Sequence, residues 1–184
     1  MPLHTTPPAF PNASRPLCAF AFLAALSARA LATDWTLCPG LRDPATEGAT
    51  APRYEVFLSP YTHHWSDDPE HRQVYAVSLS RLLPNDRYCG FSLFRNSFGQ
   101  PSAYAFIGKS WPGLLPSVPE LYVSASAGVI YGYVGKYKDK VPLNVGGFSP
   151  VIIPAIGYRF APNASFEIQL LGTAAFMVGA TWRF

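Results

Sequence analysis

A strict alternation of apolar residues with small or polar ones constrains this chain more than any other feature. From Leu121 to Tyr133 every odd position is apolar, whereas the even positions include Ser124, Ser126 and Gly128. Successive side chains of a β-strand point to opposite faces, so the segment predicts a strand with one apolar face. Its length suits a tilted crossing of a lipid bilayer better than an average soluble sheet.

The C-terminal segment 174–184 repeats this alternation. Trp182 and Phe184 lie on its apolar face, and Thr181 and Arg183 lie on the other. A soluble strand would expose both aromatic residues to water, whereas a membrane strand places them against lipid. A terminal Phe after such a strand resembles the signal that outer-membrane barrels present to their assembly machinery.

Eight such segments, separated by turn-forming residues, follow one another along the chain. We expect strands at residues 54–62, 73–82, 88–96, 102–111, 121–133, 149–160, 165–171 and 174–184. An even number of antiparallel strands closes into a barrel, which removes the open edges that a membrane forbids. The sequence therefore predicts an all-β fold, an eight-stranded antiparallel transmembrane β-barrel over residues 54–184. A barrel of this size excludes a wide aqueous pore, because side chains or one small ligand fill it.

Composition excludes two other classes of protein. Charged residues make up 14% of the chain, against roughly 25% in soluble domains, and aromatic residues reach 15%. Disordered chains are poor in aromatic residues, so disorder is a bad explanation. A net charge of +3 without a run of basic and aromatic residues indicates no nucleic-acid partner.

The first 32 residues have the pattern of a secretory signal peptide. Arg15 precedes the apolar stretch 17–26, and Ala30-Leu31-Ala32 fits a cleavage site before Thr33. A membrane anchor is the weaker interpretation, because a spanning helix needs about 20 apolar residues. The Pro-rich stretch before Arg15 is long for a signal, which is consistent with a start codon further downstream. We thus expect export through a cleaved signal, a periplasmic lead-in at residues 33–53 and insertion into the outer membrane.

Cleavage at this site removes Cys18 and leaves Cys38 and Cys89. An even pair of cysteines in an exported protein predicts a disulfide. Two unpaired thiols are the alternative.

Polar residues on the inward face gather near one end of the predicted barrel. Buried charges persist when they are paired, so we expect a salt-bridged floor rather than a catalytic pair of carboxylates. The floor would consist of Glu55, Arg159, Glu167, Gln169 and Arg183.

Two connections at the opposite end contain the residue types needed for acyl transfer. The first contains His64, and the second contains Asn96 and Ser97. A His near a Ser can act as a base that activates a hydroxyl group, and an amide donor such as Asn96 can stabilise an oxyanion. Solvated loop residues are the alternative.

The same loops offer two further interpretations. Clustered imidazoles and carboxylates can bind a metal, but no recognised ligand spacing is present, so we expect neither a metal nor another cofactor. The cluster consists of His63, His64, Asp67, Asp68 and His71. The basic residues Lys136, Lys138 and Lys140 either contact phosphates of lipopolysaccharide or form a solvated loop.

The order of these motifs resembles the PagP-type lipid A palmitoyltransferases, outer-membrane enzymes that move a palmitoyl chain from a phospholipid to lipid A. The resemblance runs from Tyr54 to Phe184 and is thin between its anchor motifs. Those motifs are Thr62-His63-His64 where the family has Thr-Trp-His, Leu79-Ser80-Arg81, Phe94-Arg95-Asn96-Ser97-Phe98 where the family has Phe-Lys-Asp-Ser-Trp, Pro150 to Pro154 followed by Gly157-Tyr158, and Gly172-Thr173.

The resemblance implies a set of site residues. The catalytic His of the family falls on His64, its Ser on Ser97 and its Asp on Asn96, and an amide can neither carry the charge of a carboxylate nor act as a base. Leu171 replaces a proline of the family, and Pro and Gly residues interrupt the segment 36–52 where the family has a helix.

The resemblance also implies partners and a route for lipid. The donor is a phospholipid, the acceptor is lipid A or lipopolysaccharide, and the protein is a monomer. Proline donates no hydrogen bond to a strand ladder, so Pro150 and Pro154 are expected at a gap that admits lipid sideways. Small inward residues are expected to leave room for the acyl tail, namely Ser124, Ser126, Gly128 and Gly179. A non-enzymatic barrel of the same shape and an acyl hydrolase remain the alternatives, and the sequence does not fix the acyl-chain length.

Overall fold

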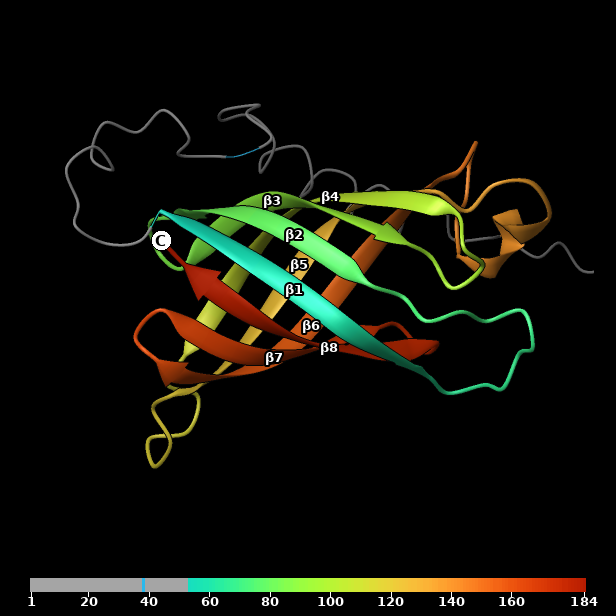
Figure 1. Ribbon diagram of the computed structural model, residues 1–184. Helices are drawn as coiled ribbons and strands as arrows, with labels where there is room; N and C mark the ends of the chain where they lie inside the picture. The colour runs from blue at the N-terminus through green and yellow to red at the C-terminus, as the bar shows by residue number, and fades with distance from the viewer. Residues whose placement is uncertain (1–37, 39–52) are drawn as a thin grey trace, which may run out of the picture. The chain divides into compact units, whose positions relative to one another are not determined.

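The computed structural model describes Cys38 and residues 53–184. Eight antiparallel strands form a closed barrel in which each strand pairs with its neighbours in sequence and β1 pairs with β8 (Figure 1). The strands are β1 (Tyr54–His64), β2 (Ala76–Leu83), β3 (Arg87–Arg95), β4 (Pro101–Pro112), β5 (Leu121–Tyr131), β6 (Phe148–Ala161), β7 (Ala164–Leu171) and β8 (Ala175–Arg183).

The predicted fold class and all eight strands are confirmed, and the differences lie at strand ends. β1 continues to His64, and β2 begins at Ala76 rather than at residue 73. β5 ends at Tyr131 instead of Tyr133, because Gly132 adopts a φ of 135°. A Cβ atom at this position would collide with the side chain of Ser102, so only glycine permits this close approach of the two strands.

The two ends of the barrel differ in their connections. The end that carries the C-terminus, here called the base, has tight turns at residues 84–86 and 162–163 (Figure 1). Asn85 and Asp86 have φ values of 60° and 58°, as a hairpin turn of type I′ requires. The opposite end, here called the loop end, carries the long connections 65–75 and 132–147. The second connection contains the short 3₁₀ helix η2 (Gly135–Lys140).

The outer surface of the barrel is apolar, as the alternation predicts. Exposed side chains on the middle of the strands are mostly aliphatic, with Phe91 of β3 as an aromatic exception, and many exposed aromatic residues lie nearer the two ends, as in the girdles of membrane barrels. The aliphatic group includes Leu58, Val77, Leu93, Ile107, Val129 and Ile152, and the aromatic group includes Tyr54, Trp65, Tyr75, Trp111, Tyr131, Phe148, Phe160, Trp182 and Phe184. No helix among the described residues is long and apolar enough to cross a membrane.

Aromatic rings line the inner wall at glycine positions of neighbouring strands. A Cβ atom at Gly179 would collide with the ring of Phe57, and one at Gly157 would collide with the ring of Tyr122. Gly128 lies against the backbone of β4. The expectation that Gly128 and Gly179 leave empty room for an acyl tail is therefore wrong, because neighbouring atoms already occupy that space.

The polar floor near the base contains one ion pair. Arg183 Nε donates to Glu55 Oε2 at 2.6 Å. Glu167 instead accepts hydrogen bonds from Tyr122 Oη at 3.1 Å and from Gln169 Nε2 at 2.7 Å. The Arg159 guanidinium lies 6.0 Å from the centre of the Tyr122 ring and pairs with no carboxylate among the described residues. Among the described residues, the floor is thus held by one salt bridge and by the hydrogen bonds of Glu167, not by salt bridges throughout.

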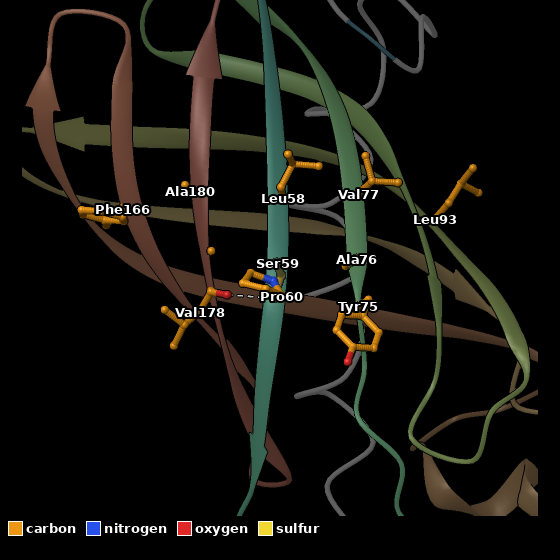
Figure 2. A pocket seen from close by; sticks show the side chains of 11 residues that line it. Leu58, Ser59, Pro60, Tyr75, Ala76, Val77, Leu93, Phe166, Val178 and Ala180 are labelled. Atoms are coloured by element: carbon orange, nitrogen blue, oxygen red, sulfur yellow. Dashed lines mark hydrogen bonds between the residues drawn. The ribbon is translucent and has the colours of Figure 1, made fainter.

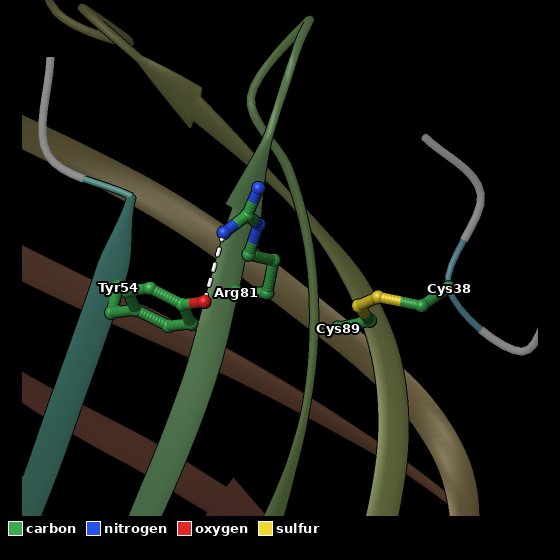
Figure 3. Close-up of a disulfide and its surroundings, with 4 residues drawn as sticks. All are labelled: Cys38, Tyr54, Arg81 and Cys89. Atoms are coloured by element: carbon green, nitrogen blue, oxygen red, sulfur yellow. Dashed lines mark hydrogen bonds between the residues drawn. A yellow bond between two sulfur atoms is a disulfide. The ribbon is translucent and has the colours of Figure 1, made fainter. Parts of the chain in front are cut away.

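Cys38 and Cys89 form a disulfide with Cα atoms 5.5 Å apart. The neighbours of Cys89 along β3 face the lumen, so its side chain points out of the wall and the bridge lies outside the barrel. The disulfide lies near Arg81, whose guanidinium donates to Tyr54 Oη at 2.9 Å (Figure 3). The expected signal peptide lies outside the described residues, and of the expected lead-in only Cys38 and Arg53 are described.

Candidate functional site at the loop end

A cavity of about 680 Å³ occupies the lumen. This volume falls within the roughly 300–1,000 Å³ of small-molecule sites. Its middle is apolar and includes Phe57, Ile130 and Met177, while the polar floor closes it toward the base. His64 and Ser97 both line its loop end. The structure thus brings the two predicted groups to one cavity.

His64 is the last residue of β1 rather than a loop residue, and strand alternation decides which histidine faces the lumen. The ring of His64 lies 4.4 Å from the ring of His71, centroid to centroid. His63 points outward and packs on Trp65 at 5.6 Å and on Phe176 at 5.2 Å. His63 therefore belongs to the outer aromatic girdle.

Ser97 is buried where two connections meet. Its carbonyl oxygen accepts a hydrogen bond from the backbone N–H of Arg72 at 2.7 Å, which docks the β1–β2 connection onto the β3–β4 connection. Its hydroxyl group faces the phenol of Tyr133. Burial raises the pKa of Tyr133, and a hydrogen bond with Ser97 opposes this shift. The backbone of Ser97 is thus held in place by the β1–β2 connection.

Asn96 is 1% exposed, and its side chain forms hydrogen bonds within the β3–β4 connection and to Gly132. Its Oδ1 accepts from the backbone N–H groups of Phe98 and Gln100, both at 3.0 Å. Its Nδ2 donates to the carbonyl of Gly132 at 3.1 Å and to Gln100 Oε1 at 3.4 Å. Both amide hydrogens are therefore in use, and stabilising an oxyanion would require the loss of one of these bonds.

Asp68 and His71, which the sequence suggested only as candidate metal ligands, line the same cavity. His71 Nε2 lies 3.9 Å from Asp68 Oδ2. The spacing of three residues is the available sequence signal, because it permits a tight turn that brings the two side chains together. The backbone N–H of His71 donates to the carbonyl of Asp68 at 2.9 Å and closes that turn.

The three lysines predicted to contact lipid all lie within η2, and two of them already have carboxylate partners. Lys136 Nζ bonds to Glu70 Oε1 at 2.5 Å, and Lys140 Nζ lies 3.3 Å from Asp68 Oδ2. The hydrogen bond with Glu70 raises the pKa of Lys136 above its usual range. Lys138 forms no ion pair with a described residue. Contact of Lys136 and Lys140 with lipid phosphate thus has to compete with carboxylates.

The described part of the chain holds no group of three or more His, Cys, Asp or Glu side chains arranged for a metal ion. His64, His71 and Asp68 instead form a small acid–base cluster beside Ser97. Such a cluster can transfer protons to and from an ester.

The strand ladder is incomplete at two places in the loop-end half of the wall. β6 pairs with β7 only from Ala155 toward the base, so residues 148–154 have no partner on that side, and this stretch contains Pro150 and Pro154. Both prolines remain in register with β5, opposite Val129 and Ala125. The break in strand pairing beside Pro150 and Pro154 therefore lies between β6 and β7.

The second interruption lies between β1 and β2. Their pairing ends at Ser59 and Ala76, and Pro60 follows in a bulge of β1. Ser59 Oγ donates to the carbonyl of Val178 on β8 at 2.9 Å. Figure 2 shows Pro60 between Val178 and Tyr75 on an apolar outer surface, where a groove of about 590 Å³ follows the interruption.

Comparison with known proteins defines the fold. A de novo designed transmembrane β-barrel is similar over 74% of this chain and 98% of its own, with 12% identity and a TM-score of 0.52. The Yersinia pestis outer membrane protein Ail aligns over 72% of this chain and 99% of its own, with 13% identity and a TM-score of 0.37. No family model and no curated protein matches the sequence. The closed barrel and its similarity to the designed protein thus show the fold of transmembrane β-barrels, and neither comparison assigns an activity.

Proposed function

We propose that this protein is an outer-membrane acyltransferase that moves a palmitoyl-type chain from a phospholipid to lipid A. The observation that carries the proposal is one cavity with an apolar middle and with His64 and Ser97 at its loop end. An acyl tail fits the apolar part, and its ester then lies at the loop end beside the acid–base groups.

The lumen favours an acyl chain because its lining includes apolar side chains such as Phe57, Ile130 and Met177, beside the hydroxyl groups of several serines and tyrosines. Each methylene group that leaves water for such a surface contributes about 0.8 kcal/mol. The polar floor of Glu55, Glu167 and Arg183 limits how deep the chain reaches, since an apolar tail gains nothing against charged groups.

The incomplete pairing of β6 supports lateral entry of lipid. Seven residues of β6, 148–154, lack a partner on β7, so their separation breaks no ladder hydrogen bonds there. Pro150 and Pro154 lie within this stretch and have no backbone N–H to donate to a neighbouring strand. A lipid in the membrane thus has a route into the lumen that avoids water.

A non-enzymatic barrel is the second candidate, and Asn96 favours it. The side chain of Asn96 is fully engaged in holding the β3–β4 connection, which explains the residue without any catalysis. A hydrolase is the third possibility, because the same groups can direct water instead of a lipid hydroxyl at the ester.

Mass spectrometry of lipid A from cells with and without the protein tests the proposal. A gain of one palmitate-sized mass supports transfer. Loss of one acyl chain contradicts transfer in favour of hydrolysis. Unchanged lipid A at equal amounts of folded protein contradicts enzymatic activity and supports the inert barrel.

A further inference from the structure

His71 lies at the loop end of the cavity with one ring nitrogen unused. Its ring lies 4.4 Å from His64 and 5.3 Å from Phe98, centroid to centroid. His71 Nδ1 is buried and has no hydrogen-bond partner among the described residues. A buried polar atom without a partner costs free energy unless a ligand or water satisfies it. The atom therefore indicates a contact that the described residues do not supply.

Asp68 faces the other nitrogen of this ring from beyond direct hydrogen-bond distance. Asp68 Oδ2 lies 3.9 Å from His71 Nε2, while Asp68 Oδ1 accepts the backbone N–H of Glu70 at 2.9 Å. That backbone hydrogen bond, together with Lys140, holds the pKa of Asp68 below its ordinary value of 3.8. Asp68 is thus a carboxylate at neutral pH. A carboxylate at one nitrogen orients an imidazole and stabilises its protonated form.

The charged and titratable groups around His71 come from three elements. Asp68 lies on the same connection, His64 comes from β1, and Lys140 of η2 reaches Asp68 Oδ2 at 3.3 Å. The β3–β4 connection contributes the uncharged ring of Phe98. The two imidazoles therefore differ in their surroundings, since a carboxylate faces only His71.

The connection that carries His71 is docked directly onto Ser97. Arg72, the next residue after His71, donates its N–H to the carbonyl of Ser97 at 2.7 Å. His64, His71 and Ser97 line one cavity. Two imidazoles in different surroundings are what a reaction with two proton transfers requires.

We propose that His71 is the general acid of this site, that Asp68 is its positioning residue, and that His64 is the base. This inference rests on the acyltransferase function proposed above. Ser97 Oγ donates to the ester carbonyl oxygen as negative charge develops on it. The oxygen of the acceptor hydroxyl bonds to the ester carbonyl carbon while its proton passes to His64. The bond from that carbon to the glycerol oxygen of the donor breaks, and this oxygen takes a proton from His71. A proton then passes from His64 to His71 through water at the loop end, which restores both groups. Asp68 thereby supplies the carboxylate that Asn96 cannot provide.

Two acyl donors with different leaving groups distinguish a general acid at His71 from a histidine with only a structural role. Glycerol oxygen is a poor leaving group that needs a proton, whereas p-nitrophenolate departs without one. We expect His71→Ala to lower transfer from a phosphatidylethanolamine donor by roughly 100-fold and to change cleavage of p-nitrophenyl palmitate little. His64→Ala should impair both reactions, because each needs the base. The full chain in detergent micelles serves for both assays.

The pH profile gives a second readout. A base that must be neutral limits activity at low pH, and an acid that must be protonated limits it at high pH, so the wild type should show a bell-shaped profile. His71→Ala should lose the alkaline limb and keep the acidic limb. Asp68→Asn should resemble His71→Ala, and Asp68→Glu should restore part of the activity.

Glu70→Gln is the matched control. Glu70 lies on the same connection as Asp68, and its replacement removes the ion pair with Lys136 but leaves Asp68 intact. It should retain activity. An equal loss in Glu70→Gln and Asp68→Asn would show that the carboxylates only hold the loops together and would overturn the inference. If His71→Ala lost equal activity toward both esters, or if it kept the alkaline limb of the pH profile, the inference would also be overturned. The proposed acyltransferase function would not be affected by either result. A folded wild type that is inert toward both esters would overturn the function and the inference together.

Discussion

Replacing one partner of the ion pair in the barrel floor should lower the free energy of unfolding more than replacing both partners. Glu55 Oε2 and Arg183 Nε are 2.6 Å apart, and the two side chains are only 16% and 20% exposed. Glu55→Leu removes the carboxylate that is paired with the guanidinium, and the nearby Glu167 is already hydrogen-bonded to Tyr122 and Gln169.

The size of the effect follows from this burial. Removal of one partner from a buried ion pair costs about 3–5 kcal/mol, whereas replacing both by apolar residues is often neutral or stabilising. Because water in the lumen reaches part of both side chains, we expect about 3 kcal/mol for Glu55→Leu or for Arg183→Met. The double variant should lose less free energy of unfolding than either single variant.

Urea unfolding of the refolded barrel, followed by tryptophan fluorescence, measures these differences at equilibrium. Thr173→Ala, which removes a small side chain at the loop end, is a control for substitution as such. If each single variant is as stable as the wild type, or if the two losses simply add in the double variant, the floor is not held by this pair.

Three further predictions concern location, covalent structure and pH. The apolar outer faces of β5 and β8 predict recovery with outer membranes and heat-modifiable migration on gels, and recovery as a soluble periplasmic protein would contradict them. A bridge between Cys38 and Cys89, 51 residues apart, stabilises the fold by about 4 kcal/mol in the chain-entropy model, so thiol labelling of unreduced, denatured protein should find no free cysteine. Two labelled thiols per chain would refute the bridge. Hydrogen bonding depresses the pKa of Asp68 below 3.8, so the contact between Asp68 and Lys140 should persist at pH 4 and be lost only as the pH falls further. Chemical-shift titration of a labelled Lys140 measures this loss, and a loss above pH 4 would contradict the prediction.

Much of the fold could be predicted from the sequence because strand alternation and membrane burial act on the same residues. The period of two in residues 121–133 decides which side chains face lipid, and the closed sheet follows from the need to pair every strand edge. Strand ends were less predictable. Gly132 ends β5 through a backbone conformation that depends on its approach to Ser102, and alternation does not encode that contact.

The candidate site was predictable only in part. The sequence indicated His64 and Ser97, but their presence in one cavity depends on barrel closure. The partners of Lys136 and Lys140 could not be predicted, because Glu70 and Asp68 lie more than sixty residues away and meet them only where the two connections fold together. The same holds for Asn96, whose bond to Gly132 gives it a structural role that its loop position does not suggest.

The inner wall shows a second limit of sequence analysis. Small residues predicted an open lumen, yet the rings of Phe57 and Tyr122 pack against the glycines of neighbouring strands. Alternation reveals that a glycine faces inward but not which ring covers it, because that depends on the register between strands.

The central claim, acyl transfer by a unit that includes His64 and Ser97, is tested most directly by lipid A acylation in single and double variants. Cells should contain equal amounts of folded wild type, Ser97→Ala, His64→Ala and the double variant, with His63→Ala as the matched control because His63 faces the outer girdle. Residues of one catalytic unit are strongly non-additive. We therefore expect each single variant to abolish palmitate addition, the double variant to be scarcely worse than either, and His63→Ala to retain most activity. Full acylation by Ser97→Ala or His64→Ala would contradict the account, even with the barrel intact.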